Sequence, residues 1–578
     1  MYSSIFGFLY LFVVCNLLIV VTSKKPPTVK TSNGRVEGYR EEVSGSQLDV
    51  FMGIPYAKPP VGNLRCRRPE PSENWKEHLR AVHPPNACFQ VIDDSFDQFR
   101  GVDMWNAQGD LSEDCLYLNI WVPKARTSRG LTTLVWIYGG GFFAGDSGLS
   151  IYDGRYLAAM NDVIVASMNY RVEALGFLYA GNQRAPGNMG LLDLALAMKW
   201  IYNNIEAFGG NRKKLTIFGE SGGAVSVGLH LLSPITRNYF NKAILQSGSP
   251  ISSWGYLSPQ DSMITTKRFA KALGCPDDDI DSMMDCINGT EPSEIVRNQY
   301  VNFDKGFQAT SRPTTDNYFL ADSPIKLLLD GQFKNTKILT GFNKNEYSMI
   351  LLFTMRDLFT LQESEVKNRN EFLNAIESIV YIQNRYVLDG VVEEYELSIL
   401  ESKRRDFEDL LEDLGGDYAF KCPVIGLNRK YAELSTEVDS VYLYSFEHRL
   451  SNDPWPDWAG AMHGYEIELV FGIPFRDISN YTDAERTLSE QMMKFWTNFA
   501  KTGNPNKETD HDRGSNQWSS YDNYNQEYII LKTGSTFQTG IGLKHRECSF
   551  WNNFSRSYLT LKQMGVIQCK TISKHICS

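Results

Sequence analysis

Long hydrophobic runs are scarce in this sequence of 578 residues. Beyond the first 23 residues, no segment is apolar enough to cross a bilayer as a helix. Internal repeats, low-complexity tracts and long proline or serine linkers are also absent. These absences argue against a repeat protein or a string of small linked domains. We therefore expect one large α/β domain over residues 24–556, followed by a polar tail over residues 557–578.

Positive charge is in deficit, with 58 Lys and Arg residues against 68 Asp and Glu residues. An acidic balance disfavours nucleic acid as a partner and would attract a cationic ligand if the charge gathered at a cleft. General solubility explains the same balance without any ligand. We expect no cofactor and no metal site.

The amino terminus carries the one long apolar run, from Ile5 to Val21, followed by the small polar residues Thr22 and Ser23. This pattern predicts a cleaved secretory signal peptide over residues 1–23, with an uncleaved anchor as the alternative. The polar carboxyl terminus lacks the hydrophobic tail of a lipid-anchor signal. We expect a secreted, extracellular protein without stable membrane insertion.

Nine cysteines remain after the signal, an odd number that leaves at least one thiol free or paired with another chain. Cys577, next to last, could link two subunits, so we expect a monomer or a disulfide-linked homodimer through Cys577. Cys88 and Cys115 bracket an aromatic, acidic segment without helical period, which fits a closed loop with a binding surface. Three sequons predict glycosylation at Asn288, Asn480 and Asn553.

The most informative motif is Gly219-Glu-Ser-Gly-Gly223. A β-rich run at residues 215–218 precedes it, and helical spacing follows at residues 224–232. Glycines allow the tight turn that exposes a serine between strand and helix, so Ser221 is a candidate nucleophile. Without that context, the motif would fit an ordinary structural turn equally well.

A second glycine motif, Gly139-Gly-Gly141, follows a predicted strand at residues 134–138. Three consecutive glycines let the backbone turn its N–H groups toward one point, as an oxyanion hole requires. The alternative is a merely flexible loop.

Five segments together carry a resemblance to a family: SEDCLYLNIWVP, WIYGGGFF, APGNMGLLD, FGESGG and HGYEIELVFG. From about Pro26 to Phe554, the chain resembles the cholinesterase and carboxylesterase branch of the α/β-hydrolase family. The resemblance implies a large, mostly parallel sheet flanked by helices, with the active site in a deep gorge. It also implies a catalytic triad of Ser221, Glu346 and His463, with three oxyanion donors at the amides of Gly140, Gly141 and Gly222.

The resemblance assigns the substrate site residue by residue. Trp105 matches the tryptophan that stacks on a quaternary ammonium in cholinesterases, where an indole face attracts a cation. Glu220 and Tyr152 complete the implied choline site. The implied gorge positions are Val91, Asp93, Phe143, Met349, Ile350, Phe353 and Glu466. The implied acyl pocket comprises Trp254, Phe307 and Ala309.

Departures from the family pattern suggest altered specificity. Several gorge positions lack the aromatic residues of vertebrate acetylcholinesterases, so a peripheral site should be weaker. Ala309 replaces a phenylalanine of the acyl pocket, so we expect acyl groups larger than acetyl to fit.

The family also implies the disulfides Cys88–Cys115, Cys275–Cys286 and Cys422–Cys548. We further predict that the extra cysteine Cys66 pairs with Cys569, which would leave Cys577 for a partner chain.

The resulting expectation is a serine esterase that cleaves choline esters through an acyl-serine intermediate, acetylcholine first, with larger acyl cholines left open. A general carboxylesterase of broad specificity is the alternative, and a non-catalytic adhesion or ligand-binding relative is a second one. An imidazole base predicts an acid limb of activity near pH 6.5.

Overall fold

A computed structural model of the chain describes residues 25–96, 98–124, 130–299, 310–362, 366, 368–380, 388–395, 407–509, 517–534 and 537–553. The predicted signal peptide and carboxyl-terminal tail lie outside these residues. No helix among the described residues is long and apolar enough to span a membrane.

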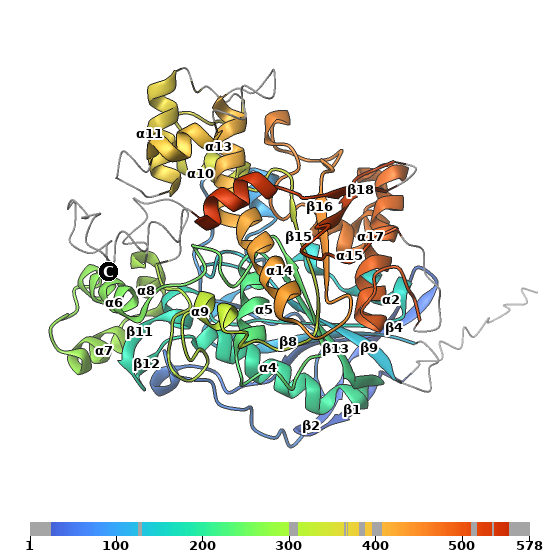
Figure 1. The fold of residues 1–578 in the computed structure, drawn as a ribbon. Helices are drawn as coiled ribbons and strands as arrows, with labels where there is room; N and C mark the ends of the chain where they lie inside the picture. The colour runs from blue at the N-terminus through green and yellow to red at the C-terminus, as the bar shows by residue number, and fades with distance from the viewer. Residues whose placement is uncertain are drawn as a thin grey trace, which may run out of the picture.

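An eleven-stranded mixed sheet runs through the molecule (Figure 1), in the order β18-β17-β16-β15-β14-β13-β9-β10-β8-β4-β3. Its strands are β3 (Tyr39–Val43), β4 (Ser46–Pro55), β8 (Tyr117–Pro123), β9 (Leu131–Ile137), β10 (Ile164–Met168), β13 (Gly210–Glu220), β14 (Lys242–Gln246), β15 (Lys337–Asn343), β16 (Val441–Phe446), β17 (Glu527–Leu531) and β18 (Gln538–Ile541). Smaller sheets contain β1 (Thr28–Thr31), β2 (Gly34–Glu37), β5 (Leu79–Arg80), β6 (Ala87–Cys88), β7 (Leu111–Ser112), β11 (Tyr179–Asn182) and β12 (Ala185–Pro186).

The middle of the sheet is parallel, from β10 and β9 through β13, β14, β15 and β16 to β17. Parallel strands covered on both faces read as continuous apolar runs, and every residue of β9 is buried. Because parallel strands point the same way, the segments that follow β9, β13, β15 and β16 emerge at one edge of the sheet. Ligand sites of open α/β sheets form at that edge.

Helices pack on both sides of the sheet. The longer ones are α2 (Arg155–Asn161), α4 (Met189–Asn204), α5 (Gly222–Leu232), α6 (Pro259–Ala272), α7 (Ile280–Gly289), α8 (Pro292–Asn298), α10 (Ser348–Thr354), α11 (Arg369–Val380), α13 (Phe407–Gly416), α14 (Cys422–Leu434) and α17 (Asp483–Thr502). The shorter ones are α1 (Arg100–Asp103), α3 (Glu173–Phe177), α9 (Pro324–Leu329), α15 (Ile467–Phe471) and α16 (Ile473–Arg476). In Figure 1, α10, α11 and α13 group at the top of the molecule, and α6, α7 and α8 group at the lower left.

The strand and helix around the nucleophile motif are longer than their sequence signals. The predicted strand at residues 215–218 is the end of β13, and the predicted helix at residues 224–232 begins earlier, at Gly222. The fold class is the one expected, a large mixed sheet flanked by helices. Between Cys88 and Cys115 the described residues are largely irregular, with only the short helix α1 and the two-residue strand β7, as predicted for a loop.

Candidate functional site

Ser221 lies in the sharp turn between β13 and α5, with φ 55° and ψ −123°. A positive φ is strained for a residue with a side chain, and such strain concentrates at functional sites. Two main-chain hydrogen bonds hold the turn: the Ser221 N–H donates to the Gln246 carbonyl (2.8 Å), and the Val225 N–H donates to the Ser221 carbonyl (2.9 Å). The side chain is thereby fixed at the edge of the sheet, and the residue is 8% exposed.

The glycines on either side of Ser221 are required by β9. A Cβ atom on Gly219 would lie 2.6 Å from the Ile137 carbonyl oxygen, and one on Gly223 would lie 2.0 Å from the same atom. No side chain fits at such distances without moving the backbone. The two glycines of the Gly-x-Ser-x-Gly pattern are thus required because the turn approaches the neighbouring strand closely.

The oxyanion loop, defined here as residues 139–145, follows β9 directly. Gly140 and Gly141 have φ of 89° and 58°, a left-handed backbone that glycine adopts readily. A Cβ atom on Gly222 would lie 3.2 Å from the Gly141 nitrogen, so the loop and the start of α5 meet beside Ser221. Two of the three amides expected as oxyanion donors, those of Gly141 and Gly222, therefore belong to segments that meet here.

Glu346 and His463 come from loops after β15 and β16 and meet in the structure. The His463 Nδ1 atom lies 2.5 Å from Glu346 Oε2, and the Asn343 N–H donates to Glu346 Oε1 (2.7 Å). Each carboxylate oxygen therefore has one partner, which orients the imidazole. The ring of Phe420 packs against the imidazole, with centroids 4.6 Å apart and the ring planes tilted by 50°. The Ser221 hydroxyl makes no hydrogen bond to a described residue, and such catalytic contacts often tighten only when substrate binds.

Glu220 faces the other side of the imidazole, with Oε1 3.1 Å from His463 Nε2. Burial alone would lower the pKa of His463, but the Glu220 and Glu346 carboxylates outweigh it and raise this pKa to about 9. Burial also raises the pKa of Glu220, and the charge of His463 opposes that rise. The acidic surroundings thus favour the imidazolium over the neutral ring.

This charge environment revises the expected pH profile. Only the neutral imidazole can accept a proton, so activity should rise with pH through an apparent pKa above 6.5, the value of an unperturbed histidine. Replacing Glu220 with glutamine removes one negative charge, so we expect the apparent pKa to fall by about 1 unit or more. A pH series of kcat/KM measures both values. An acid limb that stays in place in Glu220→Gln would contradict the role of Glu220.

Trp105 reaches the same place from the Cys88–Cys115 loop. Gly464, which follows His463, has φ 82°, and a Cβ atom there would lie 2.9 Å from the Trp105 ring and 3.6 Å from Glu220 Oε1. The half-buried indole also meets the ring of Tyr465 edge-on, with centroids 6.3 Å apart. An aromatic face and a carboxylate therefore lie together next to His463.

The Cys88–Cys115 loop is tied to the oxyanion loop by a reciprocal amide pair. The Gln90 Nε2 atom donates to the Gly145 carbonyl, and the Gly145 N–H donates to Gln90 Oε1, both at 2.8 Å. Within the loop, the Asn106 side chain bonds the main-chain N–H and carbonyl of Asp93, both at 2.8 Å. Asp93 is therefore held by its backbone, and its carboxylate accepts from the Ser95 N–H.

Two further expected positions, Glu466 of the gorge and Tyr152 of the choline site, have buried side chains. Glu466 is 0% exposed and accepts from Gln246 Nε2 (3.0 Å) and Asn343 Nδ2 (2.7 Å), so it braces the ends of β14 and β15. Tyr152 packs between Trp136 and Phe471. Tyr152 is 3% exposed, so both side chains pack against the residues around the site, and their predicted roles stay predictions.

Among the other predicted positions, Trp254 is half-buried, and its Nε1 donates to the Ala419 carbonyl (3.0 Å). Phe307 and Ala309 lie outside the described residues, so the acyl pocket stays a prediction. Of the gorge positions, Val91 is 37% exposed and Ile350 is buried. Three more are half-buried: Phe143, Met349 and Phe353.

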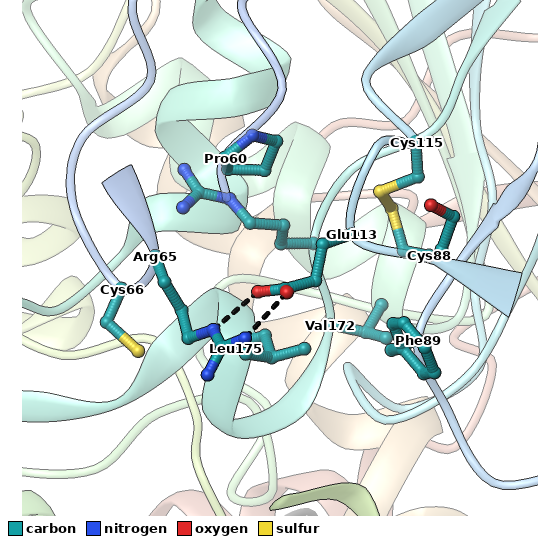
Figure 2. A pocket seen from close by; sticks show the side chains of 11 residues that line it. Pro60, Arg65, Cys66, Cys88, Phe89, Glu113, Cys115, Val172 and Leu175 are labelled. Carbon is teal, nitrogen blue, oxygen red and sulfur yellow. Dashed lines mark hydrogen bonds and ion pairs between the residues drawn. A yellow bond between two sulfur atoms is a disulfide. The ribbon is translucent and has the colours of Figure 1, made fainter. Parts of the chain in front are cut away.

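The structure contains three disulfides, Cys88–Cys115, Cys275–Cys286 and Cys422–Cys548. Cys66 has no disulfide partner among the described residues, and Cys569 and Cys577 lie outside them. Figure 2 shows the Cys66 thiol beside the paired Arg65 and Glu113, in a hollow that the Cys88–Cys115 bridge also lines. Burial raises the pKa of this thiol to about 11. The Cys66–Cys569 pair stays a prediction, testable by non-reducing peptide mapping.

The remaining predicted positions are the sequons. Asn480 and Asn553 are exposed, whereas Asn288 is half-buried and its carbonyl accepts from Arg65. Glycosylation at all three stays a prediction. Within the described part of the chain, no group of His, Cys, Asp and Glu side chains is arranged to hold a metal ion.

Several residues of the site were not predicted from the sequence. Gly464 lies against Trp105, and Phe420 packs on His463. Asn343 donates to Glu346, and Gln246 donates to Glu466. Gly464 directly follows His463 in the HGYEIELVFG segment, so its position in the sequence could have indicated that it belongs to the site. Nothing in the sequence marks the other three.

A strained serine between a central parallel strand and a helix, with an acid and a histidine from later strands of the same sheet, defines an α/β hydrolase. The carboxylesterase family model matches residues 25–551. The chain belongs to the carboxylesterase family.

Curated relatives cover nearly all of the chain. It is 40% identical to the acetylcholinesterase of Electrophorus electricus, over 91% of this chain and 88% of that protein. It is 41% identical to the acetylcholinesterase of Bungarus fasciatus and 42% identical to the cholinesterase of Mus musculus. Each of these two alignments covers 91% of this chain and 86% of the relative.

Proposed function

We propose that this protein is a secreted serine esterase that hydrolyses choline esters. The observation that carries the proposal is the position of Trp105 and Glu220 beside His463, because a cation held there would place its ester carbonyl near Ser221. The acetylcholinesterase and cholinesterase relatives support the same substrate class.

The proposed chemistry is that of the triad implied by the family resemblance, and the pairing of Glu346 with His463 supports it. His463 removes the proton of the Ser221 hydroxyl as its oxygen attacks the ester carbonyl, and Glu346 holds the imidazole and stabilises its charged form. The amides of Gly140, Gly141 and Gly222 would bind the oxyanion. The protonated His463 then gives its proton to the choline oxygen as the acyl–oxygen bond breaks. Water, activated by the neutral His463, hydrolyses the acyl-serine and restores the enzyme.

Replacing Trp105 with alanine tests the cation site. A desolvated cation–π contact is worth about 2 kcal/mol, so kcat/KM for acetylcholine should fall about 30-fold. The uncharged isostere 3,3-dimethylbutyl acetate should lose much less, because it has no charge for the indole to attract. The measurement is the ratio of kcat/KM values for the two esters in each variant.

Trp75→Ala is the matched control, since Trp75 packs on the hairpin of β1 and β2 and donates to the Arg35 carbonyl. That variant should leave the ratio unchanged. A wild-type enzyme that prefers the uncharged ester would instead indicate a general carboxylesterase.

The finer parts of the proposal concern acyl size, export and assembly. Acceptance of butyryl as well as acetyl esters rests on Ala309, and a thousandfold weaker turnover of butyrylthiocholine than of acetylthiocholine would contradict it. Cleavage after residue 23, secretion, and a monomer or Cys577-linked homodimer rest on the sequence alone. Amino-terminal sequencing of the exported protein and electrophoresis with and without reductant test these points.

A further inference from the structure

Two strained residues outside the expected triad are bonded to each other through the main chain. Phe142, in the oxyanion loop, has φ 70°, and Glu173, the first residue of α3, has φ 48°. The Glu173 N–H donates to the Phe142 carbonyl at 2.7 Å. A positive φ is uncommon for residues of this size, and it persists only where several contacts hold the residue in place.

The Glu173 side chain holds a second segment of the chain. The residue is 1% exposed, and its two carboxylate oxygens accept from the Thr310 N–H and the Ser311 N–H, each at 3.2 Å. Glu173 therefore bonds the oxyanion loop with its backbone and residues 310–311 with its carboxylate.

The segment at residues 310–312 in turn contacts the predicted acyl side of the site. Arg312 Nη1 donates to the Trp254 carbonyl at 3.3 Å. The Trp254 ring lies 6.3 Å from that of Phe142 and 5.6 Å from that of Phe420, which itself packs on His463. A shift of this segment would therefore move Trp254 relative to the oxyanion loop.

We infer that Glu173 is a positioning residue for acyl selectivity: it fixes the spacing between the oxyanion loop and the segment at residues 310–312 that supports Trp254. The inference rests on the proposed esterase function and adds to it a determinant of acyl-group size. The role needs no contact between Glu173 and substrate, since it acts through Phe142 and residues 310–312.

Glu173 titrates in an accessible range. Burial raises its pKa to about 8, opposed by the two amides and by Arg312. The oxyanion loop brings no charged side chain. Of the helices packed on α3, α4 presents Asp193, which pairs with Arg171, and α8 presents Glu294 and Arg297, which pair with each other. An ionised carboxylate binds N–H donors more tightly than a neutral one. The hydrogen bonds from residues 310–311 to Glu173 therefore strengthen as pH rises.

The test compares kcat/KM for acetylthiocholine and butyrylthiocholine from pH 6 to pH 10. The ratio of the two values cancels the titration of His463, which both substrates share. In the wild type, we expect the acetyl preference to rise by about 10-fold, the lower end of what one pocket contact supplies, through a midpoint near pH 8. Glu173→Gln keeps the size and one of the two acceptor oxygens but cannot ionise, so its ratio should not change with pH.

Two further variants complete the experiment. Glu173→Gly tolerates the positive φ but deletes the carboxylate. In this variant, the ratio of kcat/KM for acetylthiocholine to that for butyrylthiocholine should stay at or below the low-pH value of the wild type. Glu468→Gln changes another buried glutamate, bonded to the Tyr481 hydroxyl, and should keep the wild-type pH dependence. A ratio that is flat in the wild type, or equally pH-dependent in Glu173→Gln, overturns the inference.

Failure of the proposed function would give a different result. If the wild type cleaves neither choline ester, the choline proposal is wrong, and the same ratio is measured with phenyl acetate and phenyl butyrate. Loss of pH dependence in Glu173→Gln with those esters would still support the positioning role. If the wild type cleaves none of the four esters, both proposals are wrong.

Discussion

Replacing Ser221 with alanine is expected to lower kcat for choline esters by about 10,000-fold or more, because no other group can form the acyl intermediate. The fold should survive, since the turn is held by main-chain hydrogen bonds of Ser221 and by Gly219 and Gly223. Initial rates with acetylthiocholine measure the loss, and an organophosphate that labels the wild type should leave the variant unlabelled.

Ser489→Ala provides a matched control for this result. Ser489 is also buried, on α17, and its hydroxyl donates to the Leu469 carbonyl rather than facing the site. Its loss should reduce stability by about 1 kcal/mol and leave kcat unchanged. A Ser221→Ala variant that retained a tenth of the wild-type rate would mean that the nucleophile is another residue.

Gly140→Ala is expected to lower kcat by about 100-fold to 1,000-fold, the loss typical of one oxyanion donor. Gly140 has φ 89°, and an added Cβ atom would lie 2.3 Å from the Ala144 carbonyl oxygen. The loop must therefore shift, which turns its amides away from the developing charge. Because substrate binding is not the main loss, KM should change far less than kcat.

Gly222→Ala tests the same glycine-to-alanine change at a position where it fits. An added Cβ atom there meets the Gly141 and Phe142 nitrogens at 3.2 Å and 3.3 Å, which a small adjustment can relieve, and the backbone has no positive φ. We expect kcat within about threefold of the wild type, since Gly222 contributes only its N–H. Equal losses in Gly140→Ala and Gly222→Ala would argue against the assigned oxyanion loop.

Local signals in the sequence were sufficient to predict the turn at Ser221 and the glycine loop after β9. Both depend on short-range geometry, since glycine is needed where another strand approaches closely. The pairing of Glu346 with His463 depended on resemblance to a family. These residues are 117 positions apart, and neither has a local feature that marks it.

Burial of individual side chains and backbone strain could not be predicted from the sequence. Tyr152 and Glu466 match family positions by type, but the sequence does not show that packing buries both side chains. Glu173 resembles any charged residue at the start of a helix. Its positive φ and its bonds to residues 310–311 arise only when segments 137 positions apart fold together.

The reciprocal amide pair between Gln90 and Gly145 has a consequence for substrate length. It joins the loop that carries Trp105 to the loop that carries Gly140 and Gly141, so two hydrogen bonds link the segment of the cation-binding ring to that of the expected oxyanion donors. The distance between the Trp105 ring and the oxyanion donors then determines which length of spacer between ammonium nitrogen and ester oxygen fits the site. An ester with one more methylene in that spacer should be discriminated against even though its charge and acyl group are unchanged.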